Sequence, residues 1–511
     1  MDKNALYLGI ELGSTRIKAV AVDGSYRPVS SGDYTWASAY RDGIWTYDLP
    51  QAWTGLKAAL AGVSGRENIR AMGVSAMMHG YLVFDRNWDL LVPFRTWQNT
   101  VTGPAAAELT ALFGFNIPQR WSIAHLYQAI LNGEDHLSRA AHITTLAGYI
   151  HHALTGVNAV GVGEASGMFP IGPGGLDYDA DMMAKFDALP AVRAMPWKLS
   201  ELLPRVLPAG SPAGRLTPEG AALLEGLLPA GIPLAPPEGD AGTGMTAANA
   251  VAPRTGNVSA GTSIFSMVVL ERPLEHVYPQ IDLVTTPAGR PVAMVHCNNC
   301  TNDLNAWSGV LRETAALFGA GPEPGELYAR LYEKSLEGEP DCGGVLVCNY
   351  LSGEGVTGLD EGRPLVVRTP DARFTLANFL RAQLYSAMCT LKLGMDILAE
   401  EHVAVDSLTG HGGLFKTPGV GQRYMAAACG VPITCMRTAG EGGPYGMALL
   451  AAYLADRAPG ESLEEYLSAR VFGGVSGTTL APDRADAAGF NAYLARYKAL
   501  LKVERAAVER L

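Results

Sequence analysis

The sequence predicts an α/β protein built from two domains of one design. At 511 residues the chain is too long for a single hydrophobic core. Short apolar segments bounded by glycine alternate with helical segments, as in α/β proteins. A strand, glycine turn and strand near the N-terminus have a counterpart 248 residues later, just past the break Pro253-Arg254-Thr255-Gly256. We therefore expect one domain over residues 1–251 and a second over residues 252–511.

Composition excludes several classes of protein. Acidic residues outnumber basic ones, 50 to 39, so the chain as a whole carries no positive field for nucleic acid or for an anionic membrane. No run of about 18 apolar residues predicts a transmembrane helix, and the N-terminus does not resemble a secretory signal. Seven cysteines in so long a chain do not form a disulfide framework. We expect a globular, cytoplasmic protein, and a homodimer is a reasonable guess.

Two glycine turns are the first candidates for ligand binding. Tyr7–Val22 and Gly256–Leu270 each alternate like a β-hairpin around a small tip. The tips consist of Gly13, Ser14 and Thr15 in the first hairpin and of Gly261, Thr262 and Ser263 in the second. Backbone N–H groups and hydroxyls in such turns can surround a phosphate without any net positive charge. Either turn alone could be a plain hairpin tip, whereas the pair favours a polyphosphate ligand.

Charged residues flank the first turn. Glu11 interrupts an apolar strand just before it, where a carboxylate would stand beside bound phosphates and help to hold Mg²⁺. The alternative is an edge-strand charge in solvent. Lys18 could neutralise phosphate charge, or it could be an ordinary surface lysine.

The remaining elements follow in chain order. We expect buried strands at Met72–Ser75 and Tyr81–Phe84, a largely helical stretch from about 103 to 156 that ends on Gly156, and a small-residue helix from about 242 to 251. The second half predicts a strand near 346–350, a long helix over about 375–400, a glycine turn at 410–413, a small-residue helix over 446–454 and a mostly helical tail.

Asp240 follows Gly239 and precedes the first small-residue helix. At a helix N-terminus the macrodipole favours an ionised carboxylate, which is the form that a general base needs. An ordinary N-cap aspartate is the alternative.

Further polar and glycine residues suggest ligand contacts. Side chains that suit the hydroxyls and the apolar face of a small polar ligand are His79, Arg95, Trp97 and Asn99. Gly412 and Gly413, followed by Lys416, would let a flat ring approach the backbone closely. His79 could equally be an interior histidine, and a glycine pair is more often a turn. The spacing Cys297-Asn298-Asn299-Cys300 lacks the second ligand pair of a zinc site.

Taken together, these segments resemble the FGGY family of carbohydrate kinases over nearly the whole chain. The segments that carry the resemblance are Leu8–Thr15, Tyr149–Gly156, Gly163–Gly167, Leu216–Ala222, Gly239–Gly244, Gly261–Ser263, Tyr350–Gly355, Gly410–Thr417 and Gly446–Ala448. The resemblance implies a two-domain fold like that of actin, Hsp70 and hexokinase (ribonuclease H-like), with a nucleotide cleft between the domains. It also implies ATP as phosphoryl donor, Mg²⁺ as cofactor and a small sugar as acceptor.

The resemblance assigns roles to individual residues. Asp240 would take the proton from a sugar hydroxyl, Glu11 would help to position Mg²⁺, and the two turns would hold the phosphates in line with that hydroxyl. Adenine would lie against Gly412 and Gly413. Closure of the two domains would exclude water from the reaction.

The chain departs from the family pattern at two positions and leaves the substrate open. Glu11 stands where the family usually has Asp, and Trp97-Gln98-Asn99 replaces Trp-x-Asp. The segment Met78-His79-Gly80 is similar to xylulokinases, whereas Gly412–Lys416 looks closer to ribulokinases. We expect a ketose kinase, with a ketopentose such as xylulose or ribulose as substrate. The alternatives are a kinase for another polyol, deoxy-ketose or sugar acid, a degenerate sugar sensor, or a nucleotide switch like actin and Hsp70.

Overall fold

The computed structural model describes residues 5–436, 442–475 and 477–511, which fold into two compact units. The first unit takes residues 1–251, 282–292 and 441–474, and the second takes residues 252–281, 293–440 and 475–511. The main division follows Val251, where the sequence places the domain boundary. Two later segments nevertheless return to the first unit, so a single boundary along the chain does not describe the division.

The first unit is built on a five-stranded sheet of order β11-β6-β1-β2-β3. Its strands are β1 (Leu6–Leu12), β2 (Arg16–Asp23), β3 (Pro28–Thr35), β6 (Ile69–Ala76) and β11 (Glu238–Gly239). The first three form an antiparallel meander, and β6 and β11 run parallel to β1. β1 is therefore the central strand, and Leu8, Ile10 and Leu12 on it are fully buried.

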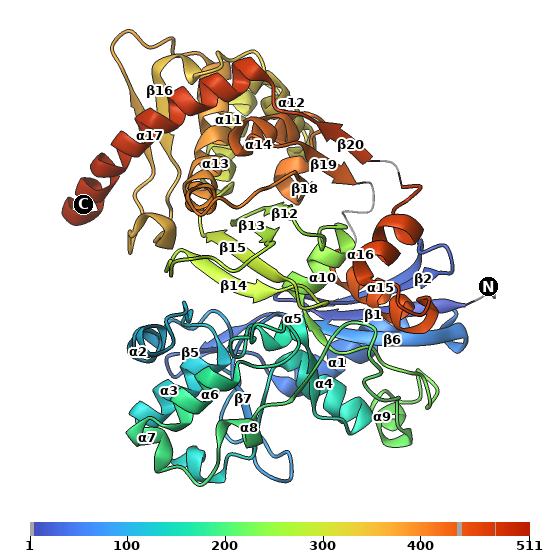
Figure 1. Cartoon of the computed structure of the whole chain (residues 1–511). Helices are drawn as coiled ribbons and strands as arrows, with labels where there is room; N and C mark the ends of the chain where they lie inside the picture. The colour runs from blue at the N-terminus through green and yellow to red at the C-terminus, as the bar shows by residue number, and fades with distance from the viewer. Residues whose placement is uncertain (1–4, 437–441, 476) are drawn as a thin grey trace. The chain divides into compact units, whose positions relative to one another are not determined.

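Helices cover both faces of this sheet. α15 (Gly442–Asp456) packs on β1, β2 and β6, and α10 (Asp240–Ala247) packs against α15. α1 (Leu49–Ala61) and α4 (Leu146–Thr155) contact strands of the sheet and lie on its other side (Figure 1). A Cβ atom on Gly9 would lie 2.0 Å from the carbonyl oxygen of Pro444, so α15 rests directly on the backbone of β1.

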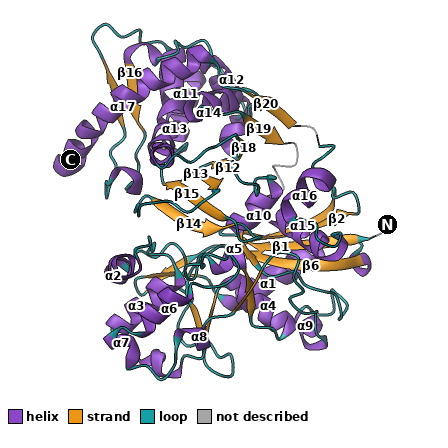
Figure 2. Ribbon diagram, in the orientation of Figure 1, coloured by secondary structure: helices purple, strands orange, loops and turns teal. Residues whose placement is uncertain are grey.

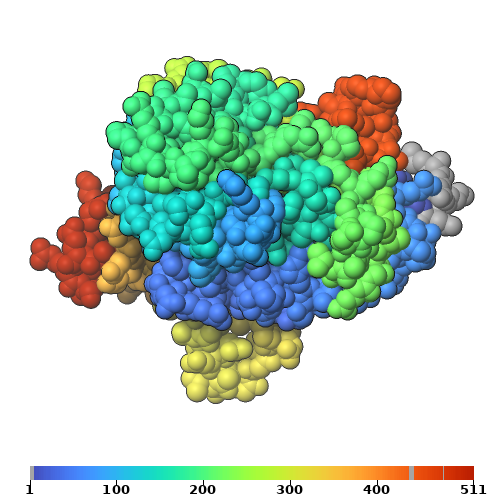
Figure 3. Space-filling model, turned by 90° about the horizontal axis from the view of Figure 1, so that it is seen from below, coloured from blue at the N-terminus to red at the C-terminus, as the bar shows by residue number. Residues whose placement is uncertain are grey.

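Most of the rest of the first unit is a layer of short elements below the sheet (Figure 1). It contains β4 (Ala39–Arg41), β5 (Ile44–Thr46), β7 (Leu82–Phe84), β8 (His142–Thr144), β9 (Ala159–Gly161), β10 (Arg205–Leu207), α2 (Gly103–Phe113), α3 (Ser122–Leu131), α5 (Val162–Ala165), α6 (Ala180–Asp187), α7 (Pro190–Arg193), α8 (Leu199–Leu202) and α9 (Pro218–Leu223). The short helix α16 (Leu463–Glu465) lies beside α15 instead (Figure 1). From below, the teal and green segment of α3–α8 covers one side of this face and the lighter green segment around α9 the other (Figure 3). α4 ends on Gly156, whose φ of 73° suits glycine, as the sequence predicts.

The second unit contains most of a seven-stranded sheet of order β14-β15-β13-β12-β18-β19-β20. Its strands are β12 (Thr255–Ala260), β13 (Ile264–Val269), β14 (Ile281–Thr285), β15 (Pro291–Cys297), β18 (Ser407–His411), β19 (Ile433–Met436) and β20 (Gly477–Leu480). β12 pairs antiparallel with β13 and parallel with β18, just as β1 pairs with β2 and β6. This shared pairing confirms the repeat that the two glycine turns predict.

Long helices dominate the second unit (Figure 2). They are α11 (Asn302–Leu317), α12 (Pro324–Ser335), α13 (Leu376–Glu400), α14 (Val420–Cys429) and α17 (Arg484–Arg510), and a hairpin of β16 (Val345–Cys348) and β17 (Leu365–Arg368) packs beside them. Across the described ranges, no helix is long and apolar enough to span a bilayer.

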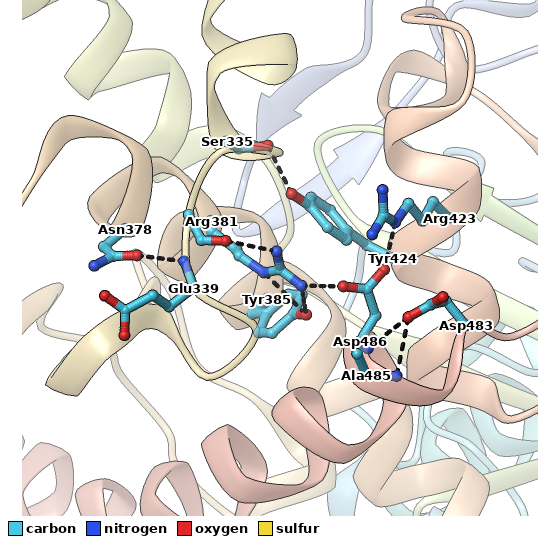
Figure 4. A network of polar contacts seen from close by, with 11 residues as sticks. Ser335, Glu339, Asn378, Arg381, Tyr385, Arg423, Tyr424, Asp483, Ala485 and Asp486 are labelled. Carbon is cyan, nitrogen blue, oxygen red and sulfur yellow. Dashed lines mark hydrogen bonds and ion pairs between the residues drawn. The ribbon is translucent and has the colours of Figure 1, made fainter.

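An ionic network holds three of these helices together. The carboxylate of Asp486, in the first turn of α17, bonds the guanidinium groups of Arg381 in α13 and Arg423 in α14 (Figure 4). Arg381 also bonds the hydroxyl of Tyr385, at 2.8 and 3.1 Å. Both Arg381 and Asp486 are almost completely buried, so this network fixes the C-terminal helix to the core of the unit.

Candidate active site

The first glycine turn keeps its carbonyl groups occupied. The amide of Gly13 donates to the carbonyl of Arg16 at 2.9 Å and closes the turn. The carbonyl of Gly13 accepts from the indole of Trp36 at 2.7 Å, and that of Ser14 accepts from the hydroxyl of Tyr47 at 2.6 Å. Because these carbonyl groups are satisfied by protein, the turn can offer its remaining amides, those of Ser14 and Thr15, and its hydroxyls to an anion. Sequence reasoning missed Trp36 and Tyr47, since neither lies near the turn in the chain.

The second turn is anchored in the same manner. The carbonyl of Gly261 accepts from the hydroxyl of Thr301 at 2.7 Å and from its amide at 3.2 Å. The carbonyl of Thr262 accepts from the amide of Cys300 at 3.1 Å. Cys300 is a buried free thiol whose pKa burial raises to about 12, so the segment that contains it serves here as a structural support for the turn.

The glycine pair lies beside the second turn within the second unit. β12 and β18 run parallel with Ser259 opposite His411, so their ends meet at one edge of the sheet. Gly412 has a φ of 99°, and a Cβ atom there would lie 2.5 Å from the carbonyl oxygen of Ala260. Only glycine fits this position. Gly412, Gly413 and Lys416 are all exposed, which leaves the surface open to a ligand.

Glu11 lies on the central strand of the first sheet, so the alternative of a solvent-exposed edge charge is wrong. It is half-buried, stands opposite Lys18 in the β1–β2 register, and lies against Gly443, where a Cβ atom would be 1.5 Å from Oε2. Burial, together with the negative charge of Asp240, raises the pKa of Glu11 to about 8, and Lys18 opposes the shift. Glu11 and Asp240 therefore interact electrostatically at one site.

Asp240 is the first residue of α10, as the sequence predicts. Its Oδ1 accepts a hydrogen bond from the backbone amide of Met78 at 3.1 Å, and the side chain remains exposed. The helix dipole is expected to favour the ionised form of Asp240, but the surrounding protein has the larger effect. Protein atoms crowd the carboxyl and raise its pKa above the usual range, although the amides of Met78 and Ala241 oppose the shift.

Met78 and His79 form a tight turn beside Asp240. His79 has a φ of 73°, uncommon for a residue other than glycine and a conformation that costs backbone energy. Its ring is buried, lies 3.2 Å through Nδ1 from the carbonyl of Gly167 and stacks on Trp121. Strained residues of this kind cluster at functional sites.

Besides His79, three further residues expected around the sugar differ in their surroundings. Trp97 is partly exposed and donates from Nε1 to the hydroxyl of Ser14 at 3.3 Å. Arg95 forms a two-pronged ion pair with Glu134. Asn99 is buried, and its amide is spent on the backbone of Trp45 and Thr96. Direct contacts of Arg95 and Asn99 with a substrate stay predictions, and both residues also hold this segment in shape.

Two buried carboxyl groups next to Asp240 escaped the sequence analysis. Glu164 and Glu238 are 0 and 1% exposed, and the carboxylate of Glu238 accepts the amide of Glu164 at 2.9 Å. A glutamate within a segment otherwise made of glycine, proline and small residues is the signal that could have identified them. Burial raises the pKa of both groups, to about 8 for Glu238.

The donor set around Glu11 fits Mg²⁺. Mg²⁺ prefers carboxylate oxygens, and it is commonly bound through one or two carboxylates together with substrate phosphates. No group of three or more metal-ligating side chains occurs within residues 5–436, 442–475 and 477–511. The negative charges of Glu11 and Asp240 repel each other, and a bound Mg²⁺ would reduce that repulsion.

The fold has the two-domain architecture of actin and hexokinase. Sequence profiles of the FGGY family of carbohydrate kinases match residues 6–246 with the N-terminal domain and residues 256–455 with the C-terminal domain. The chain therefore belongs to the FGGY family of carbohydrate kinases. Members of this family are sugar kinases that use ATP.

Individual relatives are distant. A xylulose kinase of Haemophilus influenzae is 21% identical over 436 residues, 81% of this chain and 83% of the relative. The crystal structure of a xylulose kinase from Rhodospirillum rubrum superposes with a TM-score of 0.79 at 19% identity, over 99% of this chain and 100% of that one. A gluconate kinase from Lactobacillus acidophilus has a TM-score of 0.79 at 17% identity, over 99% of both chains. The two solved structures are kinases named for different substrates, xylulose and gluconate.

Proposed function

We propose that this enzyme transfers the γ-phosphoryl group of ATP to a hydroxyl of a ketopentose, with Asp240 as general base. The observation that carries the proposal is the placement of Asp240. Its carboxylate is exposed at the start of α10 and is held through one oxygen by the amide of Met78. An ionised carboxylate exposed at this place can accept a proton, close to the strained backbone of His79.

The proposed reaction balances as a simple displacement. Asp240 accepts the hydroxyl proton, the sugar oxygen forms a bond to the γ-phosphorus, and the bond to the β–γ bridging oxygen breaks to release ADP. Gly13, Ser14 and Thr15 bind the transferred phosphate. Gly261–Ser263 and Gly412–Lys416 bind the nucleotide. Glu11 would hold Mg²⁺, which neutralises charge on the phosphates when bound.

The ketopentose is supported by sequence likeness. The segment Met78-His79-Gly80 is similar to xylulokinases, and a curated relative of 21% identity is a xylulose kinase. His79 and Trp97 supply a polar and an apolar surface for such a ligand. A gluconate kinase and a glycerol kinase share the fold, so sugar acids and polyols belong in the same test.

The test is ADP release with Mg-ATP across a panel of acceptors. The panel contains D-xylulose, L-ribulose, D-ribulose, L-rhamnulose, L-fuculose, D-gluconate, glycerol and erythritol. We expect one ketopentose to give the highest kcat/KM. Turnover of a sugar acid or polyol alone would overturn the proposed substrate, and ATP binding without turnover of any acceptor would favour the sensor.

Asp240→Asn tests the base. We expect kcat to fall about 10²- to 10⁴-fold, the usual contribution of a general base, with ATP affinity retained. The matched control is Asp179→Asn, because Asp179 caps α6 by accepting the amide of Met182 at 2.9 Å. Full activity of Asp240→Asn would show that Asp240 is not the general base. The alternative of an N-cap aspartate does not hold, because Gly239 occupies the N-cap of α10 and no side chain caps it.

A further inference from the structure

Glu238 and Glu164 fasten the segment that carries Asp240 to the start of α5. Oε2 of Glu238 accepts the amide of Glu164 at 2.9 Å, and the carbonyl of Pro237 accepts the amide of Gly161 at 2.7 Å. β11, which consists of Glu238 and Gly239, also pairs with the end of β6. The peptide immediately before Asp240 is therefore held on two sides.

Glycines make room for the two carboxyl groups. A Cβ atom on Gly161 would lie 2.1 Å from Oε1 of Glu238, and one on Gly163 would lie 2.5 Å from Oε2. A Cβ atom on Gly239 would lie 2.4 Å from Oε2 of Glu164 and 2.8 Å from Cγ of Met78. The same packing thus joins both glutamates to the residue that binds Asp240 through its amide.

The stability of the fold does not account for this pair. The two carboxyl groups have few hydrogen-bond partners for their burial. The amides of Glu164, Gly163 and Gly239 interact with Glu238, and the hydroxyl of Thr145 interacts with Glu164. Oε1 of Glu238 and both carboxyl oxygens of Glu164 nevertheless lack a hydrogen bond of good geometry among the residues that the structure describes. Burial of unsatisfied polar groups is costly, and apolar side chains of similar volume would be at least as stable. Such residues persist where they specify a geometry.

We propose that Glu238 and Glu164 are positioning residues that fix the Gly239–Asp240 peptide, so that the carboxylate of Asp240 stays on the amide of Met78 and faces the acceptor hydroxyl. This inference rests on the proposed role of Asp240. Glu238 acts through its hydrogen bond to the amide of Glu164, and Glu164 fills the space against Gly239. A displacement of about 1 Å at a reacting group can cost about 100-fold in rate.

The test compares Glu238→Gln with Glu238→Ala. Glutamine keeps an oxygen for the amide of Glu164, so kcat should stay within about threefold of the wild type. Alanine removes the acceptor, so kcat should fall about 10- to 100-fold while KM for ATP and sugar stays within threefold. Hydrogen exchange of the amides of residues 239–244 should speed up at least tenfold in the alanine variant only.

Glu504→Ala is the matched control. Glu504 is also fully buried, its Oε1 accepts the amide of Arg363 at 2.5 Å, and the thiol of Cys348 is a further neighbour of the carboxyl, yet it belongs to the second unit. The variant Glu504→Ala should lower thermal stability without changing kcat of the folded enzyme. If Glu238→Ala does not fold, Glu238→Asp, which withdraws the carboxylate by one methylene, replaces it with the same expected loss.

Three outcomes would overturn the inference. They are equal kcat in the glutamine and alanine variants, a loss of kcat in Glu504→Ala as large as in Glu238→Ala, and unchanged exchange of residues 239–244. The exchange measurement needs no substrate. An inactive wild type with faster exchange in the alanine variant would therefore refute the proposed function while the local anchoring by Glu238 stands.

Discussion

The indole N–H of Trp97 donates a hydrogen bond to Oγ of Ser14 at 3.3 Å, although 83 residues separate the two in the chain. The sequence assigns Trp97 to the sugar and Ser14 to a phosphate. Their contact joins two segments of the first unit that are predicted to bind different ligands. A substitution at Trp97 should therefore affect the phosphate turn as well as binding of the acceptor sugar.

Trp97→Phe should weaken substrate binding without unfolding the protein. Phenylalanine keeps an apolar ring but removes the N–H donor to Ser14. A neutral hydrogen bond contributes about 0.5–1.5 kcal/mol, so KM for ATP should rise about 2- to 10-fold. Steady-state kinetics with varied ATP measures the change. An unchanged KM for ATP would show that this hydrogen bond does not support the turn.

Asn99→Asp should destabilise the protein. The amide of Asn99 donates to the carbonyls of Trp45 and Thr96 at 2.9 and 3.0 Å. A buried carboxylate facing two carbonyls loses both bonds, at about 1–3 kcal/mol. Thermal denaturation should show a Tm several degrees lower. The exposed Asn87→Asp is the control, and an equal Tm for both variants would contradict this account.

The sequence predicts local features of the fold and site well. The first hairpin, the C-terminal glycine of α4 and the start of α10 at Asp240 all depend on residues next to one another. Features that depend on distant partners were not predictable. Glu11 is central because β6 joins β1 from a segment more than 50 residues later, and the pKa of Asp240 is set by the surrounding protein rather than by its own helix.

Asp486→Asn should strongly destabilise the second unit. Asp486 neutralises Arg381, which is buried, and also bonds Arg423. Removal of one partner of a buried ion pair costs about 3–5 kcal/mol because the remaining charge stays desolvated. Chemical denaturation should show a lower midpoint. Glu337→Gln removes the exposed pair with Lys334 and should change little. A small effect of Asp486→Asn would mean that water reaches Arg381.

The stability of the first unit should fall as pH rises through the neutral range. Burial raises the pKa of Glu238 from about 4.5 to about 8 in the folded protein. Such a group contributes stability that is present below pH 4.5 and lost as pH approaches 8, because the unfolded chain releases the proton more readily. Glu238→Gln should flatten this slope between pH 5 and 8. Thermal midpoints across that range test it, and an unchanged slope would place the titration elsewhere.

The plot of kcat/KM against pH should fall on its acid side at a higher pH than it would for an ordinary aspartate. Asp240 must be ionised to accept a proton, and its pKa is raised by the crowding of protein atoms. The logarithm of kcat/KM should therefore fall as pH drops through this raised value. A limb at the pH of a free aspartate would contradict a raised pKa of Asp240 in the free enzyme.

The packing of α15 on β1 has a consequence for biosynthesis. The central strand leaves the ribosome first, but the helix that rests on Gly9 is translated more than 430 residues later. The nascent first unit must therefore wait with one face of its sheet uncovered until residues 441–474 emerge. A truncated chain that stops at residue 251 should expose that face and depend on chaperones, whereas adding residues 441–474 in trans supplies the missing cover.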